Sequence, residues 1–315
     1  MIKANNPKLK TWLEVSKDSD FPVQNIPFGI AFIKKNKVAV SRIGNTVINL
    51  SKLYDLGAFS GIISENYFNK EFLNDFLKRN KTDWRSVRNK ISEIFKNENN
   101  KEIYKSSLHN IQDVEMCMPV KVGDYTDFYS SRQHAYNVGC MFRDPDNALL
   151  PNWLHIPVGY HGRSSSIILS GIDIYRPKGQ QLPLNSNAPI FGPSKLLDFE
   201  LEMAFITGEG KPLGDSITIE EAEDYIFGMV IFNDWSARDI QKWEYVPLGP
   251  FLAKNFASSI SPWIVTLDAL EPFRCEGELQ QTEVLPYLKF SGKKNIDINL
   301  EVQIESKNFS PHTIS

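Results

Sequence analysis

The chain has 315 residues, enough to bury a substantial core and more than most single domains contain, so two domains are expected. Its formal net charge of −3 gives no reason to expect nucleic acid or an anionic membrane as a partner. No apolar run approaches the length of a membrane span, and residues 1–10 lack the apolar region of a secretory signal. Three scattered cysteines, Cys117, Cys140 and Cys275, indicate reduced thiols and a cytoplasmic protein.

Short β-strands are predicted after an extended lead-in that ends near Asn25. The segments 28–33, 38–43 and 46–50 are apolar or alternating, and Gly44-Asn45 is a tight-turn signal between the last two. These hairpins indicate a small barrel or curled sheet.

Two helices are predicted next, because apolar residues recur at helical spacing in 72–77 and again in 84–95. The polar stretch 96–101 indicates a solvated helix end or linker. We place a domain boundary after it, giving domains 1–118 and 119–315. The first domain carries no residues that indicate chemistry, so we expect it to serve packing or dimer support.

The second domain is predicted to consist of strands separated by turns rich in glycine and proline. Thr218 and Glu221 have capping-box spacing and predict a short helix that ends near Tyr225. A buried strand is expected at 226–232, and Ser236 is expected to cap the helix that follows. Alternating apolar residues predict a half-buried strand at 296–304.

Reactive side chains gather in the ten residues from Tyr125 to His134, which include a carboxylate, phenols, hydroxyls, a guanidinium and an imidazole. Such a mixture is typical of a functional loop on a rigid scaffold. The alternative is a polar surface loop whose Asp and Ser side chains only satisfy local backbone groups. Cys140 lies nearby, but nothing in the sequence marks it as an activated nucleophile.

Glu200 and Glu202 are the strongest local signal for a metal site. In a strand, alternate side chains share a face, so these two carboxylates point the same way, and Asp198 would extend that face. Neighbouring carboxylates repel, and a cation removes the repulsion. Oxygen ligands favour Ca²⁺ or Mg²⁺ over zinc. The alternative is an exposed acidic edge, unless distant carboxylates such as Asp127 join the pair.

Asp234 is a second distant carboxylate, placed where the buried strand 226–232 turns into a helix. A helix cap is the alternative role, although Ser236 is better placed for it. Lys254 has apolar neighbours, which suggests that its ammonium pairs with carboxylates.

These motifs resemble the fumarylacetoacetase family. The resemblance runs from about residue 18 to the C-terminus and is carried by the strings at 123–139, 151–155, 197–202 and 233–239. It implies a mainly β fold with some α, in which a small N-terminal SH3-like barrel domain precedes a mixed β-roll catalytic domain. It also implies a homodimer.

The resemblance implies a role for each matching residue. It implies a Ca²⁺ site formed by Asp127, Glu200, Glu202 and Asp234. It implies a Mg²⁺ site that uses Asp234, Lys254 and Ser258. The substrate-binding residues would be Tyr129, Arg143, Gln241 and Tyr245, with Tyr160 lining the same pocket. His134 would be the general base, and Arg238, Gln241 and Lys254 would stabilise an oxyanion. His155 and His161 are the competing bases.

The implied activity is metal-dependent hydrolysis of a β-diketo acid to fumarate and acetoacetate, the last step of tyrosine and phenylalanine breakdown. A related enzyme that acts on acylpyruvates by hydrolysis, decarboxylation or isomerisation is the first alternative. The family continues for about a hundred further residues, a substantial part of a domain, which supply a substrate-binding Thr and a Glu that orients the histidine. We therefore expect a truncated product with little activity, or a non-catalytic remnant. Ser258 and Ala257 also replace Thr and Gly of the family pattern.

Overall fold

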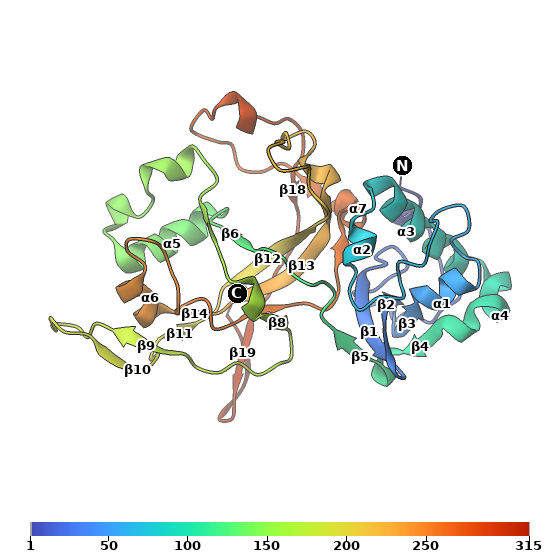
Figure 1. The fold of residues 1–315 in the computed structure, drawn as a ribbon, viewed down its shortest axis with the longest axis horizontal. Helices are drawn as coiled ribbons and strands as arrows, with labels where there is room; N and C mark the ends of the chain where they lie inside the picture. The colour runs from blue at the N-terminus through green and yellow to red at the C-terminus, as the bar shows by residue number, and fades with distance from the viewer. Residues whose placement is uncertain (1, 315) are drawn as a thin grey trace.

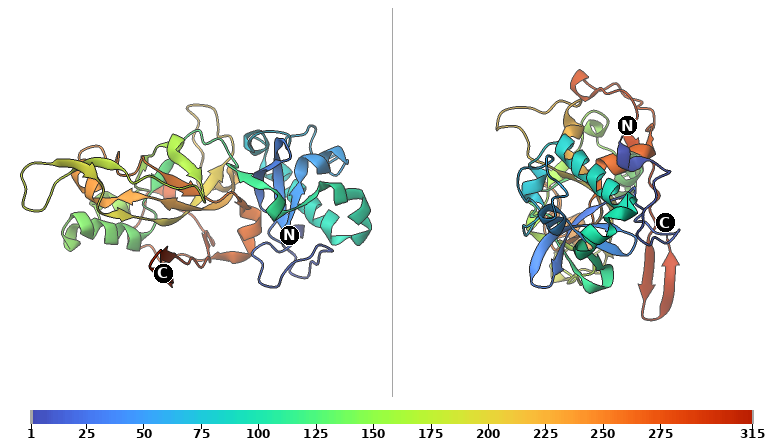
Figure 2. Two further views of the ribbon diagram at one scale, coloured as in Figure 1. Left: turned by 90° about the horizontal axis from the view of Figure 1, so that it is seen from below. Right: turned by 90° about the vertical axis from the view of Figure 1, so that its right-hand side faces the viewer.

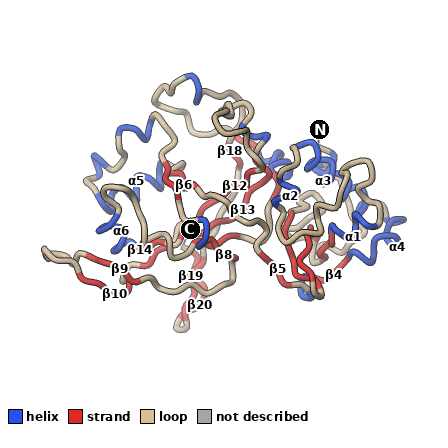
Figure 3. Tube along the Cα trace, viewed as in Figure 1, coloured by secondary structure: helices blue, strands red, loops and turns tan. Residues whose placement is uncertain are grey.

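The computed structural model describes residues 2–314. An N-terminal region and a larger second region lie side by side along the long axis of the molecule (Figures 1 and 2). Most of the long helical stretches lie in the N-terminal region and at the outer end of the second region, while strands run through the middle of each (Figure 3). No helix in 2–314 has the length and apolar character needed to cross a bilayer. All three cysteines are free thiols.

The N-terminal region is built on a five-stranded antiparallel sheet in the order β4-β3-β2-β1-β5. Its strands are β1 (Phe28–Ile33), β2 (Asn36–Ile43), β3 (Thr46–Asn49), β4 (Leu108–Asn110) and β5 (Glu115–Cys117). The two predicted hairpins are therefore confirmed. Closure of this sheet into a barrel stays a prediction, as β4 and β5 end the pairing order.

Four α-helices accompany this sheet: α1 (Leu50–Asp55), α2 (Asn74–Leu77), α3 (Lys81–Lys96) and α4 (Lys101–Tyr104). Asn80 begins α3, because its side chain accepts a hydrogen bond from the amide of Asp83. The predicted apolar face of α3 is confirmed, since Trp84, Val87 and Ile91 are buried. That face turns inward onto the sheet.

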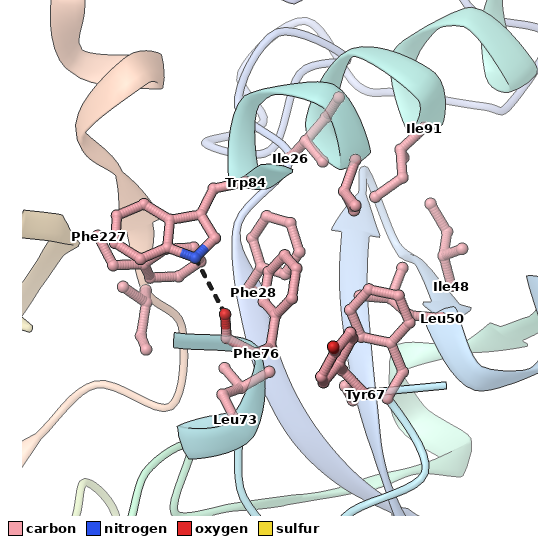
Figure 4. Close-up of a cluster of buried hydrophobic side chains, with 14 of the residues drawn as sticks. Ile26, Phe28, Ile48, Leu50, Tyr67, Leu73, Phe76, Trp84, Ile91 and Phe227 are labelled. Carbon is pink, nitrogen blue, oxygen red and sulfur yellow. Dashed lines mark hydrogen bonds between the residues drawn. The ribbon is translucent and has the colours of Figure 1, made fainter. Parts of the chain in front are cut away.

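An aromatic core joins the N-terminal region to the second region (Figure 4). Phe28 of β1 and Phe76 of α2 stack at 5.6 Å, and both contact Phe227 of the second region edge-on. Trp84 donates its indole N–H to the carbonyl of Phe76 at 3.0 Å. Burying one such ring contributes about 1.5–3 kcal/mol. The proposed boundary after residue 118 follows β5 directly, but the core continues across it.

The second region contains a five-stranded sheet in which β12 (Leu201–Thr207) pairs with the central strand β13 (Ile226–Asp234). The other strands of this sheet are β8 (Ile167–Leu169), β15 (Ser258–Ile260) and β16 (Val265–Thr266). The predicted buried strand is thus confirmed as β13. It brings residues 200–202, 234 and 258 to neighbouring positions.

Smaller elements surround this sheet. The short pair β6 (Thr126–Phe128) and β7 (Gly159–His161) places Asp127 opposite Tyr160. The pair β11 (Leu197–Asp198) and β14 (Ser236–Ala237) precedes helix α6 (Arg238–Glu244), and α5 (Arg132–Phe142) follows β6. The second region also contains the hairpin of β9 (Lys178–Gln181) and β10 (Ile190–Pro193), and the helix α7 (Leu267–Leu270).

The predicted strand at 296–304 is wrong. Exposure alternates from Ile296 to Val302 as expected. Only β18 (Asn295–Ile296) and β19 (Gln303–Ser306) pair, the first with β17 (Arg274–Cys275) and the second with β20 (Phe309–Thr313). Between them the extended chain has no neighbouring strand in the described part of the sequence, so its backbone forms no ladder. The β19–β20 hairpin projects from the body (Figure 2).

Two helix-cap predictions have different outcomes. The capping box is confirmed, because Thr218 and Glu221 exchange side-chain to backbone hydrogen bonds, although only a 3-10 turn, Ala222–Asp224, follows. Ser236 does not cap α6. Its hydroxyl lies within hydrogen-bond distance of the carbonyl of Asp234 and of a carboxylate oxygen of Glu200, and its single hydrogen can be donated to either. Ser236 lies in β14, one residue before the N-cap position Ala237, so it is not placed to accept from the first amides of α6.

Candidate active site

His134 lies in the first turn of α5, close to the acidic residues of the second region. Ser131 caps the helix by accepting a hydrogen bond from the amide of His134 at 3.2 Å. The imidazole meets the ring of Tyr129 edge-on at 5.6 Å, and its Nε2 lies 3.4 Å from Glu200 Oε2. The angles there do not make a hydrogen bond, so this buried nitrogen has no partner within residues 2–314. A buried nitrogen without a hydrogen bond needs an explanation, and a bound molecule would supply the missing partner.

Glu200 and Glu202 share a face, as predicted. The strand is interrupted between β11 and β12, and Glu200 lies in that interruption, where it is buried. One ligand atom from each of His134, Glu200 and Glu202 lies within 4.8 Å of the other two. Imidazole nitrogen and carboxylate oxygen are both metal ligands, so the chain carries a group of side chains able to hold a metal ion.

Glu200 is the most heavily paired carboxylate of the site. Arg238 contacts Oε1 at 2.7 Å, and Lys254 contacts Oε2 at 2.9 Å. Burial opposes its ionisation, but His134, Lys254 and Arg238 together hold the pKa of Glu200 well below its usual range. Glu200 is therefore a fixed negative charge.

Asp234, at the end of β13, is also fully paired. Lys254 contacts Oδ2 at 2.6 Å, and the hydroxyl of Ser258 on β15 donates to Oδ1 at 2.9 Å. The strand register explains the second contact, because Asp234 lies opposite Ser258. Burial acts to lower the pKa of Lys254, but Asp234 and Glu200 outweigh it and raise the pKa. The predicted pairing of Lys254 with carboxylates is confirmed.

Asp127 and Glu202 form no ion pair in the described chain. Burial raises the pKa of Asp127 to about 6, and the charge of Asp234 adds to the effect. Burial, with Asp127 and Glu200 nearby, raises the pKa of Glu202 to about 9. Lys254 and Arg238 already pair with the other carboxylates, so Asp127 and Glu202 carry unbalanced negative charge whenever they are ionised. A bound cation would balance that charge, so the residues fit a cation site.

Arg238 holds three residues at once. Its Nε contacts Asp198 Oδ2 at 2.8 Å, one terminal nitrogen contacts Glu200 at 2.7 Å, and the other donates to Gln241 Oε1 at 3.0 Å. Asp198 therefore lies beside Glu200 on one guanidinium, but it pairs with Arg238 and is not part of the group of His134, Glu200 and Glu202.

Of the residues predicted to bind substrate, some lie at the carboxylate cluster and others do not contact it. Tyr129 contacts His134, and burial raises the pKa of Tyr129 to about 12. Tyr160 lies opposite Asp127. Arg143 instead donates to the carbonyls of residues 147 and 148 in the turn after α5. The ring of Tyr245 packs on Phe142 at 5.2 Å. In the described chain these last two side chains form no hydrogen bond or ion pair with the carboxylate cluster.

A hollow of about 610 Å³ opens beside the cluster. Asp127, His134 and Glu202 line it, together with Phe232 and side chains of β12. This volume suits a small molecule.

Tyr125 belongs to the site but was not singled out from the sequence. Its ring packs against Phe232 at 5.4 Å and against Gly162, where a Cβ would lie 2.2 Å from a ring carbon. Its buried hydroxyl has no hydrogen-bond partner within residues 2–314. Burial strongly raises the pKa of this phenol, so it stays protonated. The available signal was its spacing of two from Asp127, which puts both on one face of an extended segment.

Two family models match the chain. The one described as Fumarylacetoacetate (FAA) hydrolase C-terminal matches residues 124–311, and the one described as Fumarylacetoacetase N-terminal matches residues 24–119.

Curated relatives match along almost the whole sequence. A fumarylacetoacetase from Dictyostelium discoideum is 50% identical over 319 residues, which cover 98% of this chain and 74% of the relative. One from Arabidopsis thaliana is 48% identical and covers 94% of this chain and 73% of the relative. A solved structure of fumarylacetoacetate hydrolase from Exiguobacterium antarcticum is 16% identical, with a TM-score of 0.44, and the match covers 79% of this chain and 69% of that one.

Proposed function

Because this chain belongs to the fumarylacetoacetase family, we propose that it hydrolyses a carbon–carbon bond of 4-fumarylacetoacetate to give fumarate and acetoacetate, in tyrosine and phenylalanine catabolism. One observation carries the proposal. Acidic residues from separate parts of the chain meet at a hollow that His134 also lines, and the buried Nε2 of this histidine has no hydrogen-bond partner within residues 2–314. A β-diketone offers the adjacent oxygens that a hard cation binds.

Calcium is the proposed ion at the cluster, held by Asp127, Glu200, Glu202 and Asp234. The unpaired state of Asp127 and Glu202, and their raised pKa values, support a cation at this place. All four ligands are carboxylates, which a hard cation prefers. When bound, the ion supplies Lewis-acid polarisation of the diketone oxygens.

Magnesium is proposed beside Asp234, with Ser258 and Lys254. The ammonium of Lys254 has no lone pair and donates to Asp234 and Glu200, so its side chain does not fit as a ligand. Lys254 could contribute only its backbone carbonyl oxygen. The hydroxyl of Ser258 already lies 2.9 Å from Asp234 and keeps a lone pair for an ion.

His134 is the proposed general base. Its free Nε2 can accept a proton from water, which then attacks a keto carbon. Arg238, Gln241 and Lys254 are the proposed donors to the oxyanion that forms, and each retains N–H groups beyond those used within the protein. One preorganised donor is typically worth about 100- to 1000-fold in rate.

Tyr129 and Tyr160 are proposed to line the substrate pocket, next to His134 and Asp127 respectively. Arg143, Gln241 and Tyr245 are proposed to bind other parts of the substrate, away from His134 and Asp127. The guanidinium of Arg143 has N–H groups left after its two carbonyl bonds, which suits a substrate carboxylate.

We further propose that the chain forms a homodimer in the cytoplasm, with domains 1–118 and 119–315. The end of β5 at Cys117 and the position of the two family matches support this division.

The test is turnover of fumarylacetoacetate by the purified protein, followed by loss of diketone absorbance and by identification of both products. Chelator should abolish turnover, and Ca²⁺ should restore it. Faster cleavage or decarboxylation of an acylpyruvate would assign the chain to the alternative substrate class. Calcium binding without turnover of either substrate would contradict an enzymatic role.

A further inference from the structure

The contacts of Arg238 determine how Gln241 presents its side-chain amide. Arg238 is 8% exposed, and its guanidinium is held from two other sides by Asp198 and Glu200. An arginine only donates hydrogen bonds, so the amide group that faces it must be the oxygen. The 3.0 Å contact from Arg238 to Gln241 Oε1 has this polarity.

The amino group of Gln241 must then point away from the guanidinium. Among the hydrogen bonds of residues 2–314, none has Gln241 Nε2 as donor. Gln241 is only 7% exposed, yet this nitrogen is not among the fully buried unpartnered atoms. It therefore keeps some solvent-accessible surface and is an available N–H donor.

Asp198 is the residue that fixes the guanidinium from outside the carboxylate cluster. The amide of Phe199 donates to Asp198 Oδ1 at 2.9 Å, which leaves Oδ2 for Arg238 Nε at 2.8 Å. Its backbone is fixed as well, because Asp198 pairs with Ser236 in the β11–β14 ladder, directly before α6. The amide of Arg238 donates to the carbonyl of Leu196 at 2.9 Å, so the backbone at both ends of this ion pair is fixed beside the same short ladder.

We infer that Asp198 is a positioning residue, which locks Arg238 so that Gln241 offers an N–H donor to a substrate oxygen. The inference deepens the proposed function and rests on it. It makes the site selective for a substrate atom that accepts a hydrogen bond. If Arg238 swings away, Gln241 loses the bond that selects its orientation, and its amide can rotate.

Kinetics of four single variants and one double variant test the inference. Asp198→Ala should lower kcat by about ten- to a hundredfold, which is the usual cost of losing a residue that orients a ligand-contacting side chain. KM should change less than twofold. Asp198→Glu, which keeps the carboxylate, should recover most of the loss. Gln241→Ala should lower kcat as well, and Asp198→Ala should cost less in that background than in the wild type, because the part of its effect that passes through Gln241 is already lost. Asp268→Ala is the matched control, since it breaks an equivalent ion pair with Arg85 on α3 and should leave kcat unchanged.

A spectroscopic measurement keeps the inference separate from the proposed function. The side-chain amide signals of Gln241, assigned by their loss in Gln241→Ala, should shift in Asp198→Ala and stay in place in Asp268→Ala. If the wild-type protein does not cleave fumarylacetoacetate but this shift is seen, only the proposed function fails. Unchanged Gln241 signals in Asp198→Ala would overturn the inference, as would an additive loss in the double variant.

Discussion

The two regions of the molecule bury charge in different ways. In the described residues up to 118, Arg88 is the one buried charged side chain, and it lies in a largely apolar core. In the second region Glu200, Asp234, Arg238 and Lys254 are buried together in a connected cluster.

The two buried arginines show what this difference means. Arg88 donates to the backbone carbonyls of Gln24 and Asn25, and burial lowers its pKa to about 10. Burial also acts to lower the pKa of Arg238, but the negative charges of Glu200 and Asp198 outweigh this effect and raise it. Within the described residues, Arg88 is held by backbone carbonyls alone, which is typical of a structural role. Carboxylates hold Arg238 next to the unpaired groups of the site, an arrangement typical of function.

The largest effect is expected from His134→Ala. A general base contributes about 100- to 10,000-fold, so kcat should fall within that range. The His134 side chain is 32% exposed, and Glu200 keeps Arg238 and Lys254 when the imidazole is removed, so the free energy of unfolding should change little. Diketone turnover and urea unfolding measure the two quantities. Near-normal turnover would remove His134 from the role of base.

Lys254→Met should be the most destabilising single change in the carboxylate cluster. It leaves Asp234 and Glu200 without their shared cation, and removing one partner of a buried pair typically costs about 3–5 kcal/mol. Urea denaturation measures the loss, and added Ca²⁺ should restore part of it. A cost under about 1 kcal/mol would mean that these charges are solvated and that the contrast between the regions is unfounded.

Arg88→Met should cost less than Lys254→Met. It leaves the carbonyls of Gln24 and Asn25 without their donor, at about 1–3 kcal/mol, and it removes a buried charge that has no carboxylate partner in contact. Turnover by the folded variant should equal that of the wild type. If kcat falls while the protein remains folded, the assignment of a purely structural role to Arg88 is wrong.

The smallest effect is a dependence of calcium affinity on pH. Glu202, with a pKa of about 9, is protonated near pH 7 in the cation-free protein and must release its proton when an ion binds. Affinity should therefore rise by up to about tenfold, or 1.4 kcal/mol, per pH unit between 7 and 9 and level off above 9. Calorimetry in buffers of different ionisation enthalpy measures the released proton. Glu202→Gln is the control, and an equal slope in that variant would assign the proton to another group.

Local patterns predicted much of what was found. The alternation in 28–50 gave the strands β1 to β3, the spacing in 84–95 gave α3, and the capping box at 218–221 formed as expected. The period of two also placed Glu200 and Glu202 on one face. Where the pattern failed, at 296–304, the alternation was present but no neighbouring strand paired with it. A strand needs a partner, and a single segment does not contain that information.

The sequence by itself determined the family, the apolar faces of the main elements and the chemical types brought to the site, because these depend on residue identity and spacing. Only the tertiary structure decided which charges pair. It assigned Asp198 to Arg238 and left Asp127 and Glu202 without a basic partner. It also placed the hydroxyl of Ser236, a predicted helix cap, within hydrogen-bond distance of Glu200. Such choices depend on distances of a few ångströms between remote segments, over which electrostatic energies change steeply.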